Sequence, residues 1–249
     1  MGMSVFCKKL CVFCACFYFS VFLIGLVGCK DNAMIGSKDY AIITGPNANL
    51  WFTENLTNKI GEISPTTSRV TQFDITTASS WPIGIAAGSD GNLWFTEDLG
   101  NKISKISPVN GSITEYGIPT AEAAIDRITV GPDGNLWFTE YLGNKIGKIS
   151  PLTGLITEYN IPTTNASPNG IAAGPDGNLW FTEYSSNKIG KLSPVTDIFT
   201  EYNIPVANAA PNQITDGPDG NLWFTEDGVN KIGKINPTTD KITEYSIPK

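Results

Sequence analysis

The stretch Asn49-Leu-Trp-Phe-Thr-Glu54 decides the fold of this chain, because the same six residues recur four more times. The other copies occupy residues 92–97, 135–140, 178–183 and 221–226, so consecutive copies start 43 residues apart. Five units of 43 residues account for 215 of the 249 residues. The chain is therefore expected to be a repeat protein, with no room within its length for a second domain.

Each unit predicts four short strands separated by turns. Gly-Pro-Asp-Gly, at residues 131–134, 174–177 and 217–220, suits a tight turn, since proline presets φ and glycine accepts a positive φ. A short connector after each glutamate predicts a hairpin, and a Ser-Pro pair followed by Thr or Gly predicts another turn. Four strands in a repeat of this length are typical of a propeller blade. We predict an all-β fold, a β-propeller of five four-stranded blades, over residues 41–249.

The repeated aromatic pair and the chain order predict how the blades would pack. The Trp and Phe of each copy are expected to wedge between neighbouring blades rather than to stack on sugars or bases. Every blade consists of consecutive residues, so the first and last blades share no strand. Closure of a ring would then rest on side-chain packing alone.

Composition removes several classes of function. Hydrophobic residues make up 41% of the chain, enough for a sizeable core. The formal charge of −7, from 17 Lys+Arg and 24 Asp+Glu, gives no electrostatic basis for binding nucleic acid. The chain contains no histidine, which excludes an imidazole as general base, metal ligand or triad member.

The N-terminal segment has the features of an export signal. All five cysteines lie within the first 29 residues, and Lys8 and Lys9 precede an uncharged run over residues 10–28. The run ends in Leu26-Val-Gly-Cys29, which resembles a bacterial lipobox. This predicts a lipoprotein-type signal peptide (1–28), lipid attachment at Cys29, a tether (29–40) and a place in the bacterial cell envelope. The alternative is an uncleaved membrane anchor, which also places the repeats outside the cytoplasm.

The repeat unit resembles that of the streptogramin B lyase family, also called virginiamycin B lyases. The resemblance covers residues 41–249 and is carried by Pro-Asp-Gly-Asn-Leu-Trp-Phe-Thr-Glu, Asn-Lys-Ile-Gly-Lys-Ile and Ile-Thr-Glu-Tyr-x-Ile-Pro. It implies a seven-bladed propeller that linearises a cyclic depsipeptide antibiotic by elimination at its ester bond. It also implies a histidine that transfers the proton and a Mg²⁺ ion.

The positions of the family's working histidines hold other residues in this chain. Those histidines follow a proline at the start of the inner strand, where this sequence has Asn169 and Asn212, with Ile83 and Asp126 in two other blades. Asparagine forms hydrogen bonds but does not exchange a proton near neutral pH. No catalytic residue is therefore assigned.

A glutamate that resembles the family's metal ligand ends each copy of the six-residue stretch. The resemblance implies that Glu183 and Glu226 hold Mg²⁺. In a closed propeller, all five equivalent glutamates would form a ring able to recruit a cation. The alternative is structural, because a lysine follows each glutamate by five residues across the predicted hairpin, as a cross-strand ion pair.

Three functional hypotheses remain open. The first is a lipid-anchored, extracytoplasmic, streptogramin-lyase-like propeller that binds a small molecule or peptide, or acts as a scaffold, with little or no lyase activity. The second is a metal-dependent lyase that opens a cyclic depsipeptide or lactone by elimination. The third is a fragment that is stable only when paired with another chain. Three inner-strand charges that break the repeat, Asp126, Arg127 and Asp216, are expected to be surface or channel charges.

Overall fold

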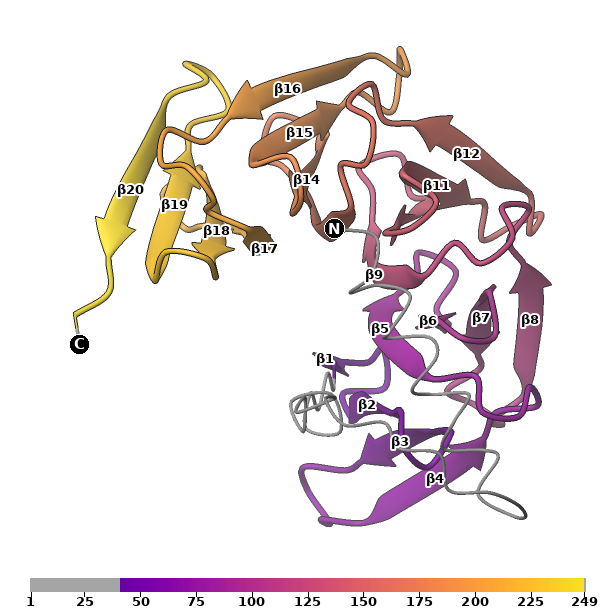
Figure 1. The fold of residues 1–249 in the computed structure, drawn as a ribbon. Helices are drawn as coiled ribbons and strands as arrows, with labels where there is room; N and C mark the ends of the chain where they lie inside the picture. Colours follow the sequence, from indigo (N-terminus) through magenta and orange to yellow (C-terminus); the bar gives the residue numbers. More distant parts are fainter. Residues whose placement is uncertain (1–40, 249) are drawn as a thin grey trace, which may run out of the picture. The chain divides into compact units, whose positions relative to one another are not determined.

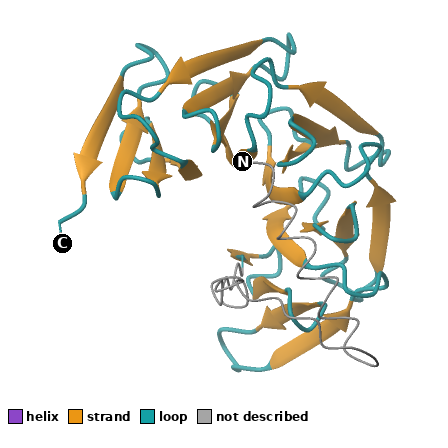
Figure 2. Cartoon of the chain, in the orientation of Figure 1, coloured by secondary structure: helices purple, strands orange, loops and turns teal. Residues whose placement is uncertain are grey.

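The chain folds into β-strands joined by turns. The computed structural model describes residues 41–248, and in this part every regular element is a strand (Figure 2). Twenty strands form five four-stranded sheets, in which each strand pairs with the next one along the chain. Each sheet holds one 43-residue unit and is called a blade below, numbered 1 to 5 in chain order (Figure 1). The prediction of an all-β fold with five four-stranded blades is confirmed.

The strand bounds repeat from blade to blade. Blade 1 contains β1 (Ile42–Thr44), β2 (Leu50–Glu54), β3 (Lys59–Ile63) and β4 (Val70–Asp74). Blade 2 contains β5 (Pro82–Ala87), β6 (Leu93–Glu97), β7 (Lys102–Ile106) and β8 (Ile113–Gly117). Blade 3 contains β9 (Ile125–Val130), β10 (Leu136–Glu140), β11 (Lys145–Ile149) and β12 (Ile156–Asn160). Blade 4 contains β13 (Pro168–Ala173), β14 (Leu179–Glu183), β15 (Lys188–Leu192) and β16 (Phe199–Asn203). Blade 5 contains β17 (Pro211–Asp216), β18 (Leu222–Glu226), β19 (Lys231–Ile235) and β20 (Ile242–Ser246).

The predictions for the N-terminal segment fall outside the described residues. These are the signal peptide (1–28), the lipid-attachment residue Cys29 and the tether (29–40), and they stay predictions. Between residues 41 and 248, no helix is long and apolar enough to cross a membrane.

The core lies between the blades, as the aromatic pair predicts. Trp180 of blade 4 packs in one buried cluster with Ile214 and Phe224 of blade 5, and both aromatic side chains are almost fully buried. The Trp180 indole also stacks on Tyr202 with a centroid separation of 5.6 Å and donates its N–H to Asp176 at 3.0 Å. In general, the Trp-bearing face of one blade packs on the Phe-bearing face of the next.

In four of the five blades, a glycine of the third strand leaves room for the phenylalanine of the second, whereas blade 2 has Ser104 at this place. Gly190 is the Cα partner of Phe181, and a Cβ atom at Gly190 would lie 2.1 Å from the Phe181 ring. We expect Gly190→Ala to lower the free energy of unfolding by about 1–3 kcal/mol, because the buried ring has to move. Gly117→Ala is the matched control, since a Cβ there meets nothing within 4 Å. Urea unfolding measures both changes, and equal effects would contradict the packing argument.

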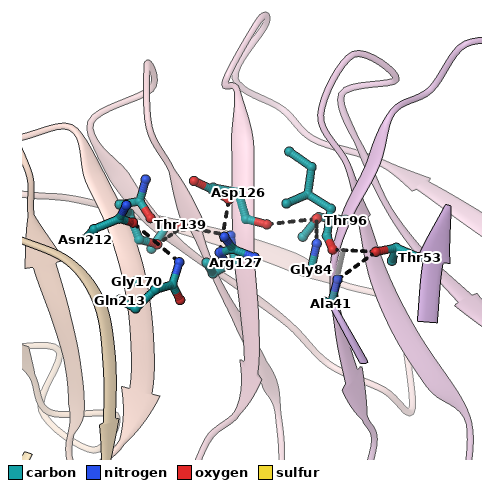
Figure 3. Close-up of polar contacts among 12 residues, drawn as sticks. Ala41, Thr53, Gly84, Thr96, Asp126, Arg127, Thr139, Gly170, Asn212 and Gln213 are labelled. Atoms are coloured by element: carbon teal, nitrogen blue, oxygen red, sulfur yellow. Dashed lines mark hydrogen bonds and ion pairs between the residues drawn. The ribbon is translucent and has the colours of Figure 1, made fainter. Parts of the chain in front are cut away.

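In blades 1 to 4, a threonine of the second strand ties the inner strand of its own blade to that of the next blade (Figure 3). Thr96 accepts a hydrogen bond from Gly84 N at 2.8 Å and donates one to Asp126 O at 2.9 Å. Thr53, Thr139 and Thr182 each donate in the same way to the inner strand of the following blade. This threonine ladder fixes the backbone at the starts of the inner strands.

Removal of one ladder hydroxyl is expected to weaken one interface. Thr182 Oγ1 accepts from Gly170 N at 2.8 Å and donates to Asn212 O at 2.6 Å. We expect Thr182→Val to lower the unfolding free energy by about 1–3 kcal/mol, since it leaves two buried backbone groups unpaired. Thr182→Ser keeps the hydroxyl and is expected to cost less. Thermal unfolding of the two variants tests this, and a valine variant as stable as the serine variant would refute it.

Candidate functional site

The positions at which the family resemblance predicts histidines lie in a row. Ile83, Asp126, Asn169 and Asn212 are each the second residue of an inner strand, and their carbonyl oxygens are the acceptors of the threonine ladder. The inner strands β5, β9, β13 and β17 pack against one another in this order. The sequence-predicted positions Asn169 and Asn212 are therefore neighbours across the interface of blades 4 and 5.

Asn212 forms a hydrogen bond that no other blade repeats. Its Nδ2 atom donates to Asp227 Oδ2 at 2.6 Å, so the amide is held by a carboxylate. The position of Asp227 carries Tyr184 in blade 4, Tyr141 in blade 3 and Asp98 in blade 2, where Ile83 takes the place of Asn212 and has no amide to donate. Sequence reasoning missed Asp227, because the aspartate alone does not mark blade 5; the signal is that blade 5 combines it with Asn212. Asn169 has a buried Oδ1 atom without a hydrogen-bond partner among the described residues.

Arg127 connects blade 3 to blade 5. Its Nε atom lies 3.3 Å from Asp126 Oδ1. With the Gln213 amide turned so that its oxygen faces the guanidinium, that oxygen accepts from Arg127 Nε at 3.0 Å and from a terminal guanidinium nitrogen at 2.9 Å. Gly170 takes the corresponding place in blade 4 (Figure 3), where a Cβ atom would lie 2.5 Å from Asn212 O and 3.1 Å from Gln213 Cα, so the glycine lets the inner strand of blade 5 approach closely.

These side chains form a row site, defined here as Asp126, Arg127, Asn169, Asn212 and Gln213. The row site presents amide donors and acceptors, one guanidinium and one carboxylate. Such groups match the peptide bonds and polar side groups of a peptide-like ligand. Asp216, the other inner-strand charge singled out in the sequence, is exposed at the far end of β17 and is not part of this row.

The repeated glutamates lie elsewhere, on the faces between blades. Four of them are between 0% and 1% exposed: Glu97, Glu140, Glu183 and Glu226. The fifth, Glu54, is half-buried and accepts hydrogen bonds from Gln72. The five are thus not equivalent.

The predicted ion pair between each of these glutamates and the following lysine is wrong for the buried copies. Glu140 and Lys145 are Cα partners, as the spacing predicts. Lys145 Nζ, however, binds Glu158 Oε2 of the outer strand at 2.7 Å, and the lysines of blades 2 and 4 do the same with Glu115 and Glu201. The ion pair and the pKa of the outer glutamate are coupled, because the hydrogen bond from Lys145 itself helps to lower the pKa of Glu158.

The two carboxyl groups of blade 3 differ in protonation. Burial, reinforced by the charge of Glu158, raises the pKa of Glu140 to about 8. Burial opposes ionisation of Glu158 as well, but hydrogen bonds from Lys145 and Thr120 outweigh it and lower the pKa of Glu158. Burial likewise raises the pKa of Glu183 and of Glu226 to about 7. In blade 3, the Glu140 carboxyl is therefore largely neutral near pH 7, and the Glu158 carboxyl is charged.

The structure gives Glu183 and Glu226 separate surroundings. Glu183 lies with Glu201 and Lys188 of blade 4, and Glu226 lies with Glu244 and Lys231 of blade 5. Within residues 41–248, no three acidic or other metal-binding side chains gather closely enough to hold a metal ion. Mg²⁺ sites in proteins use one or two carboxylates and several waters. Here a lysine ammonium lies against the outer carboxylate of each pair, Lys188 with Glu201 and Lys231 with Glu244, so the residues present do not match such a site. The magnesium site stays a prediction.

Comparisons with known proteins agree with the fold. The model of the virginiamycin B lyase family matches residues 31–249. Virginiamycin B lyase from Staphylococcus aureus is 41% identical, with a TM-score of 0.80 over 84% of this chain and 69% of that chain. A catalytically inactive histidine-to-alanine variant of the S. aureus enzyme, with quinupristin, is 42% identical, with a TM-score of 0.79 over 83% and 69% of the two chains.

A structure of streptogramin B lyase is 41% identical, with a TM-score of 0.79 over 84% of this chain and 68% of that one. No curated protein matches the chain. The likeness to these lyases extends over 83–84% of the chain, and the family model covers more than half of it. The chain therefore belongs to the virginiamycin B lyase family.

Proposed function

We propose that this protein is a lipid-anchored, extracytoplasmic, lyase-like propeller that binds a cyclic depsipeptide or a related peptide and leaves its ester bond intact. The observation that carries the proposal is the row of Asn169 and Asn212 at the positions where the family's histidines are expected. An amide holds a peptide-like ligand by hydrogen bonds but does not transfer the proton that elimination requires. Arg127 and Gln213 add further donors and acceptors to the same row.

A relative supports the separation of binding from cleavage. The S. aureus variant with one histidine replaced by alanine is catalytically inactive and was crystallised with quinupristin. A chain without histidine would resemble that variant in function. The protein is then expected to retain the ligand and to release it unchanged.

The proposal is tested with quinupristin as probe. The purified chain is incubated with quinupristin and Mg²⁺; titration calorimetry measures binding, and mass spectrometry follows the linear product. We expect binding without linear product, and we expect Arg127→Ala and Asn212→Ala to weaken binding. Formation of linear product at an enzymatic rate would overturn the binding role. No binding by the unmodified chain would refute a depsipeptide ligand.

A second candidate, an elimination enzyme without histidine, is favoured by one observation. The Glu226 carboxyl has a pKa raised to about 7, in the range that suits proton transfer, and Glu226 is the Cα partner of Pro211, which precedes Asn212. Linear product that disappears in Glu226→Gln would support this candidate. Linear product that persists in that variant would exclude Glu226 from the reaction.

The anchor is part of the proposal and has its own test. The lipobox-like ending at Cys29 predicts that the chain carries a lipid in a bacterial host. We expect labelled palmitate to be incorporated into the chain and to be lost in Cys29→Ala, with the protein moving from the membrane fraction to the soluble fraction. A variant that stays in the membrane fraction would instead support the uncleaved transmembrane anchor.

A further inference from the structure

The residue that follows the invariant glutamate differs from blade to blade. The six-residue stretch that ends at this glutamate is identical in all five blades, but the next residue is, in chain order, Asn55, Asp98, Tyr141, Tyr184 and Asp227. A connector position that varies while the strands beside it stay the same is not required by the fold of the blade, and binding residues are often found at such positions. The two tyrosines, in blades 3 and 4, are therefore candidates for a role in binding.

This variable position lies beside the row site. The backbone N–H of Tyr184 donates to Ser167 O at 3.2 Å, two residues before Asn169, and blade 3 has the same bond. Blade 5 repeats the bond from Asp227, and there the side chain reaches Asn212 of the row site. The Tyr184 side chain therefore starts from the same place relative to Asn169.

The two tyrosine rings meet across the interface of blades 3 and 4. The ring centroids of Tyr141 and Tyr184 are 6.4 Å apart, and the ring planes are inclined by 51°. Both side chains are half-buried, and neither hydroxyl has a hydrogen-bond partner among residues 41–248. Part of each ring therefore faces solvent, and a third ring can stack on one of them and meet the other edge-on.

Packing between blades does not account for the tyrosine pair. The interfaces of blades 2 and 3 and of blades 4 and 5 have one aspartate and one tyrosine at these places, and both interfaces form. The aromatic side chains that hold the blades together are the Trp and Phe of the repeated stretch, which are fully buried in blades 2 to 4. The half-buried tyrosine pair is thus additional to the core and is available to a ligand.

The charges near the pair favour an uncharged aromatic group. Aromatic faces also attract cations, but the carboxylate of Asp126 is already paired with Arg127, whose Nε atom lies 3.3 Å from Oδ1. The guanidinium would repel a second cation. The amides of Asn169 and Asn212 can hold a peptide bond by hydrogen bonds beside the rings. An aromatic side group attached to a peptide backbone fits this combination.

We propose that Tyr141 and Tyr184 form an aromatic subsite that takes an aromatic side group of the peptide-like ligand, while the row site holds the neighbouring peptide bond. The proposal deepens the binding role proposed above and rests on it. It assigns the ligand to the peptides or depsipeptides that carry an aromatic side group next to an amide. It also predicts discrimination against aliphatic groups of the same size.

The test compares two uncharged probes of similar size, N-acetylphenylalaninamide and N-acetylcyclohexylalaninamide, of which only the first carries an aromatic ring. Titrations followed by saturation-transfer NMR measure the affinity of the full chain for each probe. We expect the aromatic probe to bind about 3- to 10-fold more tightly, the range of an aromatic contact beyond the burial of area. Equal affinities, or no binding of the aromatic probe, would overturn the subsite.

Tyr141→Asp and Tyr184→Asp are the decisive variants, because blades 2 and 5 already carry aspartate at this position and fold with it. We expect either variant to lose the preference for the aromatic probe, whereas Tyr184→Phe keeps the ring and should retain it. Tyr245→Leu, in the outer strand β20 where Tyr245 is 42% exposed, is the matched control and should leave the preference unchanged. A preference that survives in both aspartate variants would refute the assignment to these residues.

Failure of the subsite can be told apart from failure of the binding role. The two probes contain no ester and no macrocycle, so their binding is measured separately from that of quinupristin. Quinupristin binding by a chain without preference for the aromatic probe would refute the subsite and leave the binding role intact. A preference for the aromatic probe in a chain that does not bind quinupristin would support the subsite and refute the depsipeptide ligand.

Discussion

Glu140→Gln is expected to stabilise the protein by about 2–3 kcal/mol at pH 8 and to have little effect at pH 5. The pKa of the Glu140 carboxyl is raised from 4.5 to about 8 by burial and by the charge of Glu158. Above pH 4.5 the unfolded chain releases this proton and the folded chain retains it. The stability that Glu140 contributes is therefore fully present below pH 4.5 and is lost as the pH rises through about 8, by up to about 1.4 kcal/mol per pH unit.

Glutamine has nearly the shape of glutamic acid but carries no acidic proton, so unfolding of the Glu140→Gln variant releases no proton from this position. Urea unfolding at pH 5, 6.5 and 8 gives the free energy of unfolding of the unmodified chain and of Glu140→Gln. The two values should differ more as the pH rises, with the variant the more stable at pH 8. Parallel curves for Glu140→Gln would show that Glu140 is ionised in the folded protein.

Asn212→His is expected to raise the rate of ester opening by about 10²- to 10⁴-fold over the unmodified chain, the range that a general acid or base contributes. Asp227 Oδ2 already lies 2.6 Å from Asn212 Nδ2 and would accept the proton of one imidazole nitrogen. That hydrogen bond orients the ring and raises the basicity of its other nitrogen. The substitution places an imidazole where the family resemblance implies one.

Asn169→His is the matched control for this gain. It adds the same group one blade earlier, where Tyr184 stands in place of Asp227, so the ring lacks a carboxylate and the gain should be smaller. Mass spectrometry of linear quinupristin gives kcat/KM for each variant, and calorimetry verifies that each still binds. An Asn212→His variant that binds quinupristin but shows no gain would mean that something other than the missing histidine prevents the reaction.

The repeat made most of the fold predictable from sequence. Five copies of one unit fixed the blade count, the hairpin register that pairs Glu140 with Lys145, and the position of Trp180 between blades. The sequence spacing did not predict that Lys145 binds Glu158 rather than Glu140. The pairing depends on how deeply each carboxyl group is buried, which is a property of the packed interface rather than of the spacing.

The site was predictable in position but not in its contacts. Asn169 and Asn212 could be placed by their offset in the repeat. Arg127 and Gln213 are two units apart, and their contact depends on the missing side chain at Gly170 between them. No periodic pattern carries that information. Asp227 reaches Asn212 across a hairpin, and blade 2 also has an aspartate at this position, Asp98, so only the combination with Asn212 marks the pair.

The number of neighbours that each blade packs against has a consequence for local unfolding. Within residues 41–248, blades 2, 3 and 4 each pack against two blades, and blades 1 and 5 each pack against one. Amide hydrogen exchange in this part of the chain should therefore be slowest in blade 3 and fastest in blades 1 and 5. Asn212 and Gln213 lie in blade 5, which frays early, whereas Arg127 lies in the most protected blade. A ligand held by both blades would therefore slow exchange throughout blade 5, and the protection pattern would report occupancy of the row site.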